Sequence, residues 1–202
     1  MKKLILLVIL LIACGILYAK LDALVGYFSM SKKKVASSSH LLHKEAVKKK
    51  NLLIAYFSWG GNTKEMATFI HERIGGDLFE ITPRDSDHYP KEYKPTVEVG
   101  AREVKEKIYP PCAELPDLSS YDTILIGYPI WWHEAPMIVQ GFLRSYNLSG
   151  KTILPFATSG GDDVALTVPS IEASAKGARI GKALTANIKR RIVPWLKMHE
   201  LY

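Results

Sequence analysis

The sequence predicts an α/β domain with a doubly wound, five-stranded parallel sheet and helices on both of its faces. One observation is that apolar runs of strand length alternate with segments of helical periodicity from residue 51 onward. Such alternation implies parallel strands joined by right-handed crossovers. A second observation is that loops rich in small, polar or aromatic residues follow three of these runs, where a sheet of this kind binds its ligands.

Four apolar runs are the predicted strands, because each is bounded and short. A fifth strand is predicted over Ala178–Thr185, where the pattern is weaker. The four clear runs are Asn51–Phe57, Leu78–Thr82, Thr123–Tyr128 and Thr152–Ala157.

The segments between the runs carry helical patterns. Thr63–Ile74 has its apolar residues at helical spacing, and Thr96–Ile108 has the composition of an exposed, charged helix. Pro136–Tyr146 opens with a proline, which the first turn of a helix accepts. Asn187–Glu200 is predicted as the closing helix, interrupted at Pro194.

The formal net charge of +7 does not indicate a domain that binds nucleic acid. Residues 1–50 hold ten lysines and two acidic residues, whereas residues 51–202 hold 17 basic and 18 acidic residues. A basic face for nucleic acid is expected on the folded part of a protein. The charge distribution therefore argues against nucleic acid as a partner.

The first 19 residues form an N-terminal hydrophobic segment. Lys2 and Lys3 precede an unbroken apolar run, which is the order found in export signals. Leu11–Cys14 followed by a glycine resembles a bacterial lipobox, and this resemblance implies that Cys14 becomes the lipidated first residue. We therefore expect a membrane-associated protein on the extracytoplasmic side, with residues 20–50 as a basic tether and residues 51–202 as the domain.

Two other interpretations of this hydrophobic segment stay open. Leu4–Ala19 supplies 16 residues where a bilayer-spanning helix wants about 20, but snorkelling flanks would permit an uncleaved anchor. A conventionally cleaved secretory signal is the other interpretation. Leu17 opposes it, because that side chain is too large for the small-residue site before a cut after Ala19.

Cysteine and histidine usage predicts neither a disulfide framework nor a bound metal. Cys112 has no partner once Cys14 is assigned to the lipobox, so we expect a packed thiol, with a redox-active role as the alternative. The six histidines show no zinc-ligand spacing.

The loop Ser58–Thr63 joins the first predicted strand to the first helix and is a candidate phosphate site. Its glycines permit close backbone approach, and the helix N-terminus supplies unpaired N–H groups and a positive dipole end. A simple helix cap is the alternative. Residues 150–152 imitate the end of a nucleotide-hydrolase phosphate loop, but Ser145 stands where that motif needs glycine.

Two further loops follow the third and fourth predicted strands. Trp131 and Trp132 are adjacent and cannot both point into the same core layer, whereas two such rings suit a planar ligand. Thr158–Asp163 again combines small residues with hydrogen-bond donors. For Asp162 and Asp163, capping of the segment that follows is the alternative to a place beside a ligand.

Together these segments resemble the flavodoxin family over residues 51–202. The resemblance rests on YFSWGGNTKEMA (56–67), YDTILIGYPIWWHEAP (121–136) and SGKTILPFATSGG (149–161). It implies a flavodoxin-like fold that binds FMN noncovalently and passes electrons one or two at a time. It also implies that the flavin carries the chemistry, so no catalytic residue is assigned.

The resemblance assigns each loop to a part of FMN. Gly60 departs from the hydroxyl residue common at its position in flavodoxins, which removes one phosphate donor. Lys64 is interpreted as a solvated helix residue. The implied cofactor-binding residues are Ser58, Trp59, Gly60, Gly61, Asn62 and Thr63 around the phosphate, with Pro129, Ile130, Trp131 and Trp132 on one side of the ring and Thr158, Ser159, Gly160, Gly161 and Asp162 on the other.

Three classes of function are considered, and a membrane-tethered electron carrier is the favoured one. The first alternative is an FMN-dependent NAD(P)H:quinone-type oxidoreductase, for which the insertion Pro83–Pro116, with Tyr89 and Tyr93, could roof the flavin. A scaffold without its cofactor is disfavoured by the three intact loops. The expected partner is a redox protein or a small acceptor such as a quinone.

Overall fold

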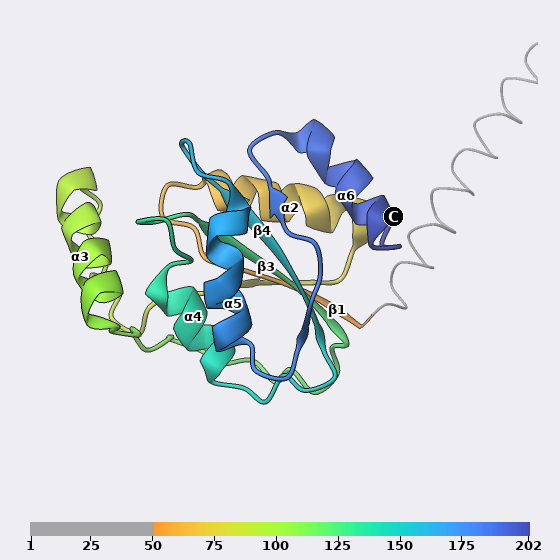
Figure 1. The fold of residues 1–202 in the computed structure, drawn as a ribbon, viewed down its shortest axis with the longest axis horizontal. Helices are drawn as coiled ribbons and strands as arrows, with labels where there is room; N and C mark the ends of the chain where they lie inside the picture. The colour runs from red at the N-terminus through yellow and green to blue at the C-terminus, as the bar shows by residue number, and fades with distance from the viewer. Residues whose placement is uncertain (1–50) are drawn as a thin grey trace, which may run out of the picture. The chain divides into compact units, whose positions relative to one another are not determined.

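The computed structural model describes residues 51–202, which form one parallel sheet covered by helices on both faces (Figure 1). The strand order is β2-β1-β3-β4-β5, every pair is parallel, and a short β6 also pairs with β4. The predicted fold class is therefore confirmed. The strands are β1 (Leu52–Tyr56), β2 (Asp77–Glu80), β3 (Thr123–Pro129), β4 (Thr152–Thr158), β5 (Arg179–Ile180) and β6 (Leu184–Thr185).

The central strands are apolar because helices cover both faces of the sheet. Every residue of β1 is buried, and so are the interior residues of β3 and β4. Strands buried on both faces read as continuous apolar runs rather than as alternating patterns. The four clear runs were therefore placed correctly, with ends that differ from the observed ones by no more than two residues.

The predicted fifth strand is wrong as a single piece. Residues 179–180 and 184–185 both pair with β4, but the chain leaves the ladder between them. The Lys182 carbonyl accepts hydrogen bonds from Trp195 Nε1 at 2.7 Å and lies 3.0 Å from His199 Nε2. That carbonyl is thus directed to the closing helix, and the ladder is interrupted there.

Two helices cover each face of the sheet. Figure 1 shows α2 (Asn62–Ile74) and α6 (Ile192–Met198) on one side, and α4 (Met137–Arg144) and α5 (Val168–Ser174) on the other. The apolar residues of α2 and α6 pack in one core cluster, and those of α4 and α5 pack in a second. The sheet therefore lies between two hydrophobic layers.

Three helix predictions need correction. The closing helix is not interrupted at Pro194, because that residue lies in the first turn of α6, where a missing N–H group costs no intrahelical bond. A short 3-10 turn, η2 (Lys189–Arg191), precedes α6. Pro136 is the residue before α4 rather than part of it. The seven-residue α5 was not predicted, because it is too short to show a period.

One further helix lies at one end of the domain, outside the two helix layers that cover the sheet. The helix α3 (Tyr93–Glu106) begins three residues before the predicted start and lies apart from the other helices in Figure 1. Half of its residues are exposed, which agrees in part with the prediction of an exposed, charged helix. Thr96, Gly100 and Glu103 form a buried stripe at helical spacing, so this helix has an inner face.

Gly127 in β3 is required by the packing of the central sheet. It is the register partner of Phe156 on β4, and a Cβ atom at Gly127 would lie 2.2 Å from Cζ of the Phe156 ring. The ring is fully buried and sits among α6 residues in its core cluster. It has little room to move aside, because protein cores are close-packed.

We expect Gly127→Ala to lower the free energy of unfolding by about 1–3 kcal/mol, because overpacking forces the neighbouring ring off its preferred rotamer. The measurement is urea unfolding followed by far-UV circular dichroism. Gly161→Ala is the matched control, since no atom of a residue beyond its two chain neighbours lies within 4 Å of that Cβ position. Equal destabilisation by the two changes would contradict this explanation of Gly127.

Candidate functional site

A cavity of about 820 Å³ lies at the carboxyl ends of β1, β3 and β4. This is where ligands bind in open parallel sheets, and the size falls in the range of small-molecule sites. All three loops singled out from the sequence line the cavity. The predicted residues that the structure brings together there are Ser58, Trp59, Gly60, Asn62, Thr63, Pro129, Ile130, Trp131, Trp132, Thr158, Ser159 and Gly160.

Three predicted site residues do not line the cavity. Gly61 precedes α2 with a left-handed φ of 88°, so it makes the turn into the helix. The N–H groups of Gly161 and Asp162 both donate to Ser159 Oγ, which folds this loop back on itself. The Asp162 carboxylate lies 3.0 Å from Nδ1 of the exposed His133.

The first loop, which lies beside the cavity, contains a row of backbone donors without acceptors. The Lys64 N–H donates to Ser58 Oγ and the Glu65 N–H to the Gly61 carbonyl. Within the described part of the chain, the N–H groups of residues 60–63 have no acceptor. The first turn of a helix leaves such groups unpaired, and together with the dipole they form an anion site.

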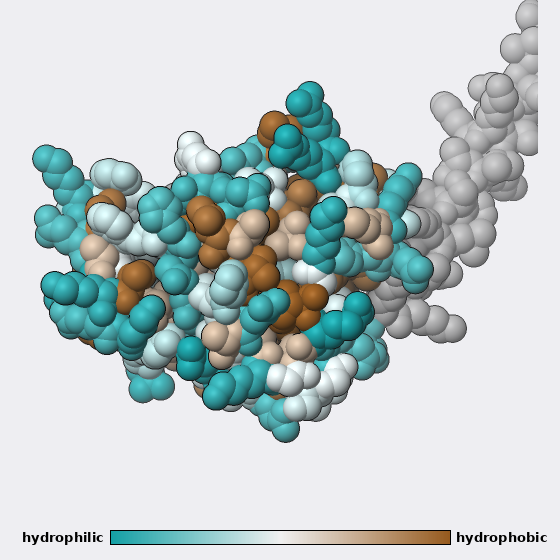
Figure 2. Space-filling model, viewed as in Figure 1, coloured by the Kyte–Doolittle hydropathy of each residue, from teal (hydrophilic) through white to brown (hydrophobic). Residues whose placement is uncertain are grey.

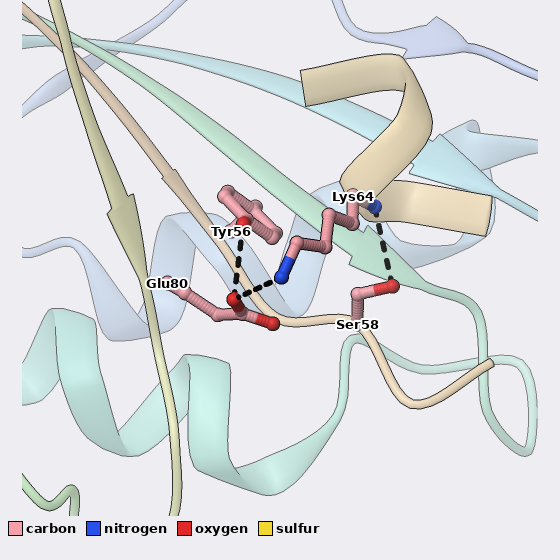
Figure 3. A network of polar contacts seen from close by, with 4 residues as sticks. All are labelled: Tyr56, Ser58, Lys64 and Glu80. Carbon is pink, nitrogen blue, oxygen red and sulfur yellow. Dashed lines mark hydrogen bonds and ion pairs between the residues drawn. The ribbon is translucent and has the colours of Figure 1, made fainter. Parts of the chain in front are cut away.

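Lys64 does not contribute its charge to this loop. Figure 3 shows its side chain reaching Glu80 on β2, where Nζ lies 2.9 Å from Oε2. The Tyr56 hydroxyl donates to the same carboxylate oxygen at 3.1 Å. Burial and, to a smaller extent, the Glu80 charge raise the pKa of Tyr56 to about 12. These contacts support the interpretation of Lys64 as a solvated helix residue.

The two tryptophans occupy different environments, as their adjacency predicted. Trp131 is half-buried, and its ring lies edge-on to Phe57 and to Tyr89 with centroid distances of 5.3 Å. Trp132 is 51% exposed, and its indole N–H donates to the Val97 carbonyl on α3. Both rings line the cavity, one fixed by the core and the other by the helix.

A tight turn holds the tryptophans in place. The N–H and carbonyl groups of Trp131 and Glu134 bond to each other at 3.0 Å, and the two residues between them have φ values of 54° and 61°. Two consecutive positive φ angles are typical of a type I′ turn, which usually takes asparagine or glycine. Non-glycine residues in this region cost conformational energy, and such strain is commonly found at functional sites.

Side-chain hydrogen bonds tie the third loop to its neighbours. Asn187, which follows β6, accepts from the Ser159 N–H and donates to the Ser159 carbonyl. Thr158 Oγ1 lies 2.9 Å from the hydroxyl of buried Thr63 in α2. Asp163 accepts from the Ala165 N–H and caps the 3-10 turn η1 (Val164–Thr167). The capping interpretation is therefore correct for Asp163.

The insertion between β2 and β3 closes the cavity on one side. Tyr93 lines it and is 72% exposed, whereas Tyr89 belongs to the core, so only one of the two tyrosines named from the sequence faces the cavity. Trp59 Nε1 donates to the Pro90 carbonyl at 2.8 Å, which holds the insertion against the first loop. The remaining lining residues were missed, namely Glu65, Met66, Thr96, Val97, Gly100, Ala186 and Asn187.

One of the missed residues had a detectable signal. Glycine is unfavourable inside a helix, so Gly100 in the middle of α3 indicates a close approach. A Cβ atom there would lie 3.3 Å from the Trp131 ring and 3.7 Å from the Trp132 ring. Absence of a side chain at this position lets α3 pack directly on the tryptophan turn.

A buried polar cluster fixes the inner face of α3. Glu103 is 1% exposed, and its carboxylate accepts a hydrogen bond from the Tyr89 hydroxyl at 3.1 Å and lies 2.6 Å from His88 Nε2. Burial raises the pKa of Glu103, while the bonds from these two neighbours act in the opposite direction. The same ring of Tyr89 packs against Trp131, so the cluster connects α3 to the cavity wall.

Two other candidate chemistries find no support in residues 51–202. The thiol of Cys112 is buried, and burial raises its pKa above the ordinary value, which is typical of a packed cysteine. No group of three His, Cys, Asp or Glu side chains in this range is placed to hold a metal ion.

Comparisons with known proteins identify relatives of this domain. A family model described as flavodoxin matches residues 51–198. A flavoprotein structure from Bacteroides uniformis is 32% identical with a TM-score of 0.61, covering 73% of this chain and 98% of that one. One from Bacteroides eggerthii is 30% identical with a TM-score of 0.64, covering 75% and 98%.

A more distant likeness concerns the fold alone. A Lactobacillus acidophilus flavoprotein, solved in complex with FMN, is 24% identical with a TM-score of 0.62, covering 72% of this chain and 98% of that one. No curated protein matched the chain.

We expect Glu103→Ala to lower the free energy of unfolding by about 3 kcal/mol, because it leaves the buried Tyr89 hydroxyl and the His88 ring without their partner. Glu103→Gln keeps a carbonyl acceptor and should cost less. Urea unfolding measures both changes, with Glu106→Ala on the exposed side of α3 as control. A cost for Glu103→Ala no larger than that of the control would show that the cluster does not hold α3.

Proposed function

The chain belongs to the flavodoxin family, and from this premise we propose that residues 51–202 bind one FMN noncovalently and pass its electrons to a partner. The observation that carries the proposal is the convergence of unpaired N–H groups and aromatic rings on one cavity. The N–H groups of residues 60–63 suit a phosphate, and Trp131 and Trp132 suit a planar ring.

The phosphate would sit at the N-terminus of α2. Ser58 and Asn62 place side-chain polar groups beside the backbone donors, and no atom of a residue beyond its two chain neighbours lies within 4 Å of the Cβ position of Gly60. The backbone there faces open space, so an anion can approach it closely. With Lys64 paired to Glu80, binding of the phosphate rests on N–H groups and the helix dipole rather than on a lysine.

The ring would lie against the tryptophan turn, between the second and third loops. FMN supplies the one- and two-electron chemistry, and the residues of this chain orient it and exclude water. Trp131 is held by the core and Trp132 by Val97, so both rings are positioned before a ligand arrives. Asp162 pairs with His133 outside the cavity lining, which reduces its expected influence on the electron affinity of the ring.

A second candidate function, an FMN-dependent oxidoreductase, is favoured by one feature, the helix α3. Tyr93, Val97 and Gly100 cover one side of the cavity with uncharged surface, which would admit a small acceptor such as a quinone more readily than a protein. Steady-state oxidation of NADH or NADPH by the purified domain distinguishes an enzyme from a carrier. A cofactor-free scaffold is disfavoured because all three loops line the same cavity.

The membrane attachment concerns residues outside the described part of the chain. The export signal, the lipobox cysteine Cys14 and the basic tether of residues 20–50 all lie outside the described residues. We propose a lipid anchor that holds the flavin domain on the extracytoplasmic side of the membrane. Among residues 51–202, no helix is both long and apolar enough to cross a bilayer.

We expect residues 51–202, expressed alone, to bind FMN with one-to-one stoichiometry and to release it on acid precipitation. The measurement is the absorption spectrum of the purified domain after incubation with FMN. A folded domain that takes up no FMN would end the proposal.

The aromatic wall supplies the matched variants for this measurement. Trp131→Ala combined with Trp132→Ala should weaken FMN binding by roughly tenfold or more, because each lost stacking contact contributes about 0.5–1.5 kcal/mol. Trp195→Phe is the control, since that ring lies in the α6 core and not in the cavity. Circular dichroism would show whether the double variant still folds. If the double variant does not fold, the two rings are part of the hydrophobic core, and their interpretation as ligand contacts is wrong.

We expect the membrane-extracted full chain to begin at a lipidated Cys14, and Cys14→Ser to abolish the modification. Two or more acyl chains would hold the protein firmly, since each buried CH₂ group contributes about 0.8 kcal/mol. Intact-mass spectrometry of both proteins is the measurement. A membrane-bound chain that keeps Met1 and an unmodified Cys14 would replace the lipid anchor by an uncleaved helix.

A further inference from the structure

Basic residues concentrate on the surface formed by η2 and α6. Residues 188–202 hold four basic residues and one acidic residue, whereas residues 51–187 hold 13 basic and 17 acidic residues. Lys189, Arg190 and Arg191 are consecutive and all exposed. A domain that is otherwise slightly acidic thus carries a local positive surface, here called the η2–α6 surface and made of Ile188, Lys189, Arg190, Arg191, Lys197 and Met198.

Two of the four cations of this surface, Arg190 and Arg191, are uncompensated within residues 51–202. Lys189 Nζ lies 2.7 Å from Glu65 Oε1 on α2, and Lys197 lies over the Tyr202 ring. Arg190 and Arg191 form no ion pair with any other residue in 51–202. Two guanidinium groups are therefore available to an external anion, and guanidinium suits phosphate oxygens especially well.

Apolar side chains accompany these cations. Ile188 is 41% exposed and directly precedes η2, and Met198 is 50% exposed beside Lys197. Figure 2 shows hydrophilic side chains projecting at the top of the view, over the start of α6, with a hydrophobic one at their base. Single exposed apolar residues are ordinary, but a basic and apolar mixture is typical of segments that lie in a membrane interface.

We propose that the η2–α6 surface binds the anionic headgroups of a lipid bilayer. Basic residues attract such headgroups, and the exposed Ile188 and Met198 can enter the boundary between headgroups and acyl chains. A tether like the one predicted for residues 20–50 would keep the domain within reach of the bilayer and raise its effective concentration there. If the partner were an acidic protein instead, the folded domain would not bind anionic vesicles.

The surface lies next to the cavity. Asn187, which lines the cavity, precedes the surface directly, and Glu65, which also lines it, is the ion-pair partner of Lys189. Docking would therefore bring this edge of the cavity close to the membrane, where an acceptor dissolved in lipid could reach it. That consequence rests on the proposed flavin function, whereas lipid binding itself does not.

Residues 51–202 provide a test without the N-terminal anchor. Both core clusters lie within this range, and the flavodoxin family model matches residues 51–198, so we expect this range to fold on its own. The experiment is co-sedimentation with phosphatidylcholine vesicles, with and without phosphatidylglycerol, at low and high salt. FMN uptake, recorded in parallel, reports on the other proposal separately.

We expect binding only to vesicles that contain phosphatidylglycerol, and weaker binding at high salt. Arg190→Gln combined with Arg191→Gln should lower the partition coefficient about 25-fold, since each basic residue near an anionic surface contributes about a factor of five. Ile188→Ser should lower it further. The control is Lys94→Gln combined with Lys105→Gln on α3, which removes the same charge from exposed positions elsewhere.

Two results would overturn the proposal. One is the absence of binding to anionic vesicles by a domain that is folded. The other is an equal loss of binding in the Arg190/Arg191 and Lys94/Lys105 variants, which would mean that total charge rather than this surface determines attraction. If the domain binds lipid but takes up no FMN, the lipid-binding proposal stands and only the proposed flavin function is rejected.

Discussion

Burial of three parallel strands on both faces is the constraint on which the rest of the structure depends. β1, β3 and β4 have helices above and below, so most of their side chains are apolar on both sides, and a polar group within them costs stability unless it has a hydrogen-bond partner, as the Tyr128 hydroxyl has in Thr167. Polar chemistry is thereby confined to the strand ends. The three loops at the carboxyl ends meet there because the strands are parallel and adjacent.

Specific side-chain hydrogen bonds then determine how these loops face one another. The hydroxyl groups of Thr63 and Thr158 join the first loop to the third, and Asn187 holds the third loop by both the oxygen and the NH2 group of its side-chain amide. These bonds occupy side chains and leave the first N–H groups of α2 available. The same region is thus held in place and still able to bind an anion. A loop held by its own backbone N–H groups would have none left to donate to an anion.

The insertion that carries α3 converts an open crevice into a cavity. Its position depends on the Trp59–Pro90 and Trp132–Val97 hydrogen bonds and on the carboxylate of Glu103, which is buried among polar partners. Trp59 and Trp132 therefore have two roles, since each lines the cavity and also holds the insertion in place through its indole N–H group.

The sequence alone determined the fold class, four of the strands and most of the cavity lining. A strand that is apolar along its whole length must be buried on both faces of the sheet, which predicts covering helices on both sides. The loops between these strands carried local signals such as Gly60 and the paired tryptophans. Only the tertiary structure decided that Asp162 lies outside the lining, that the fifth strand breaks at Lys182, and that Thr96, Val97 and Asn187 belong to the site. These outcomes depend on contacts between residues 13 to 35 positions apart, namely Asp162 with His133, Lys182 with Trp195 and Val97 with Trp132. No local pattern encodes a partner at that separation.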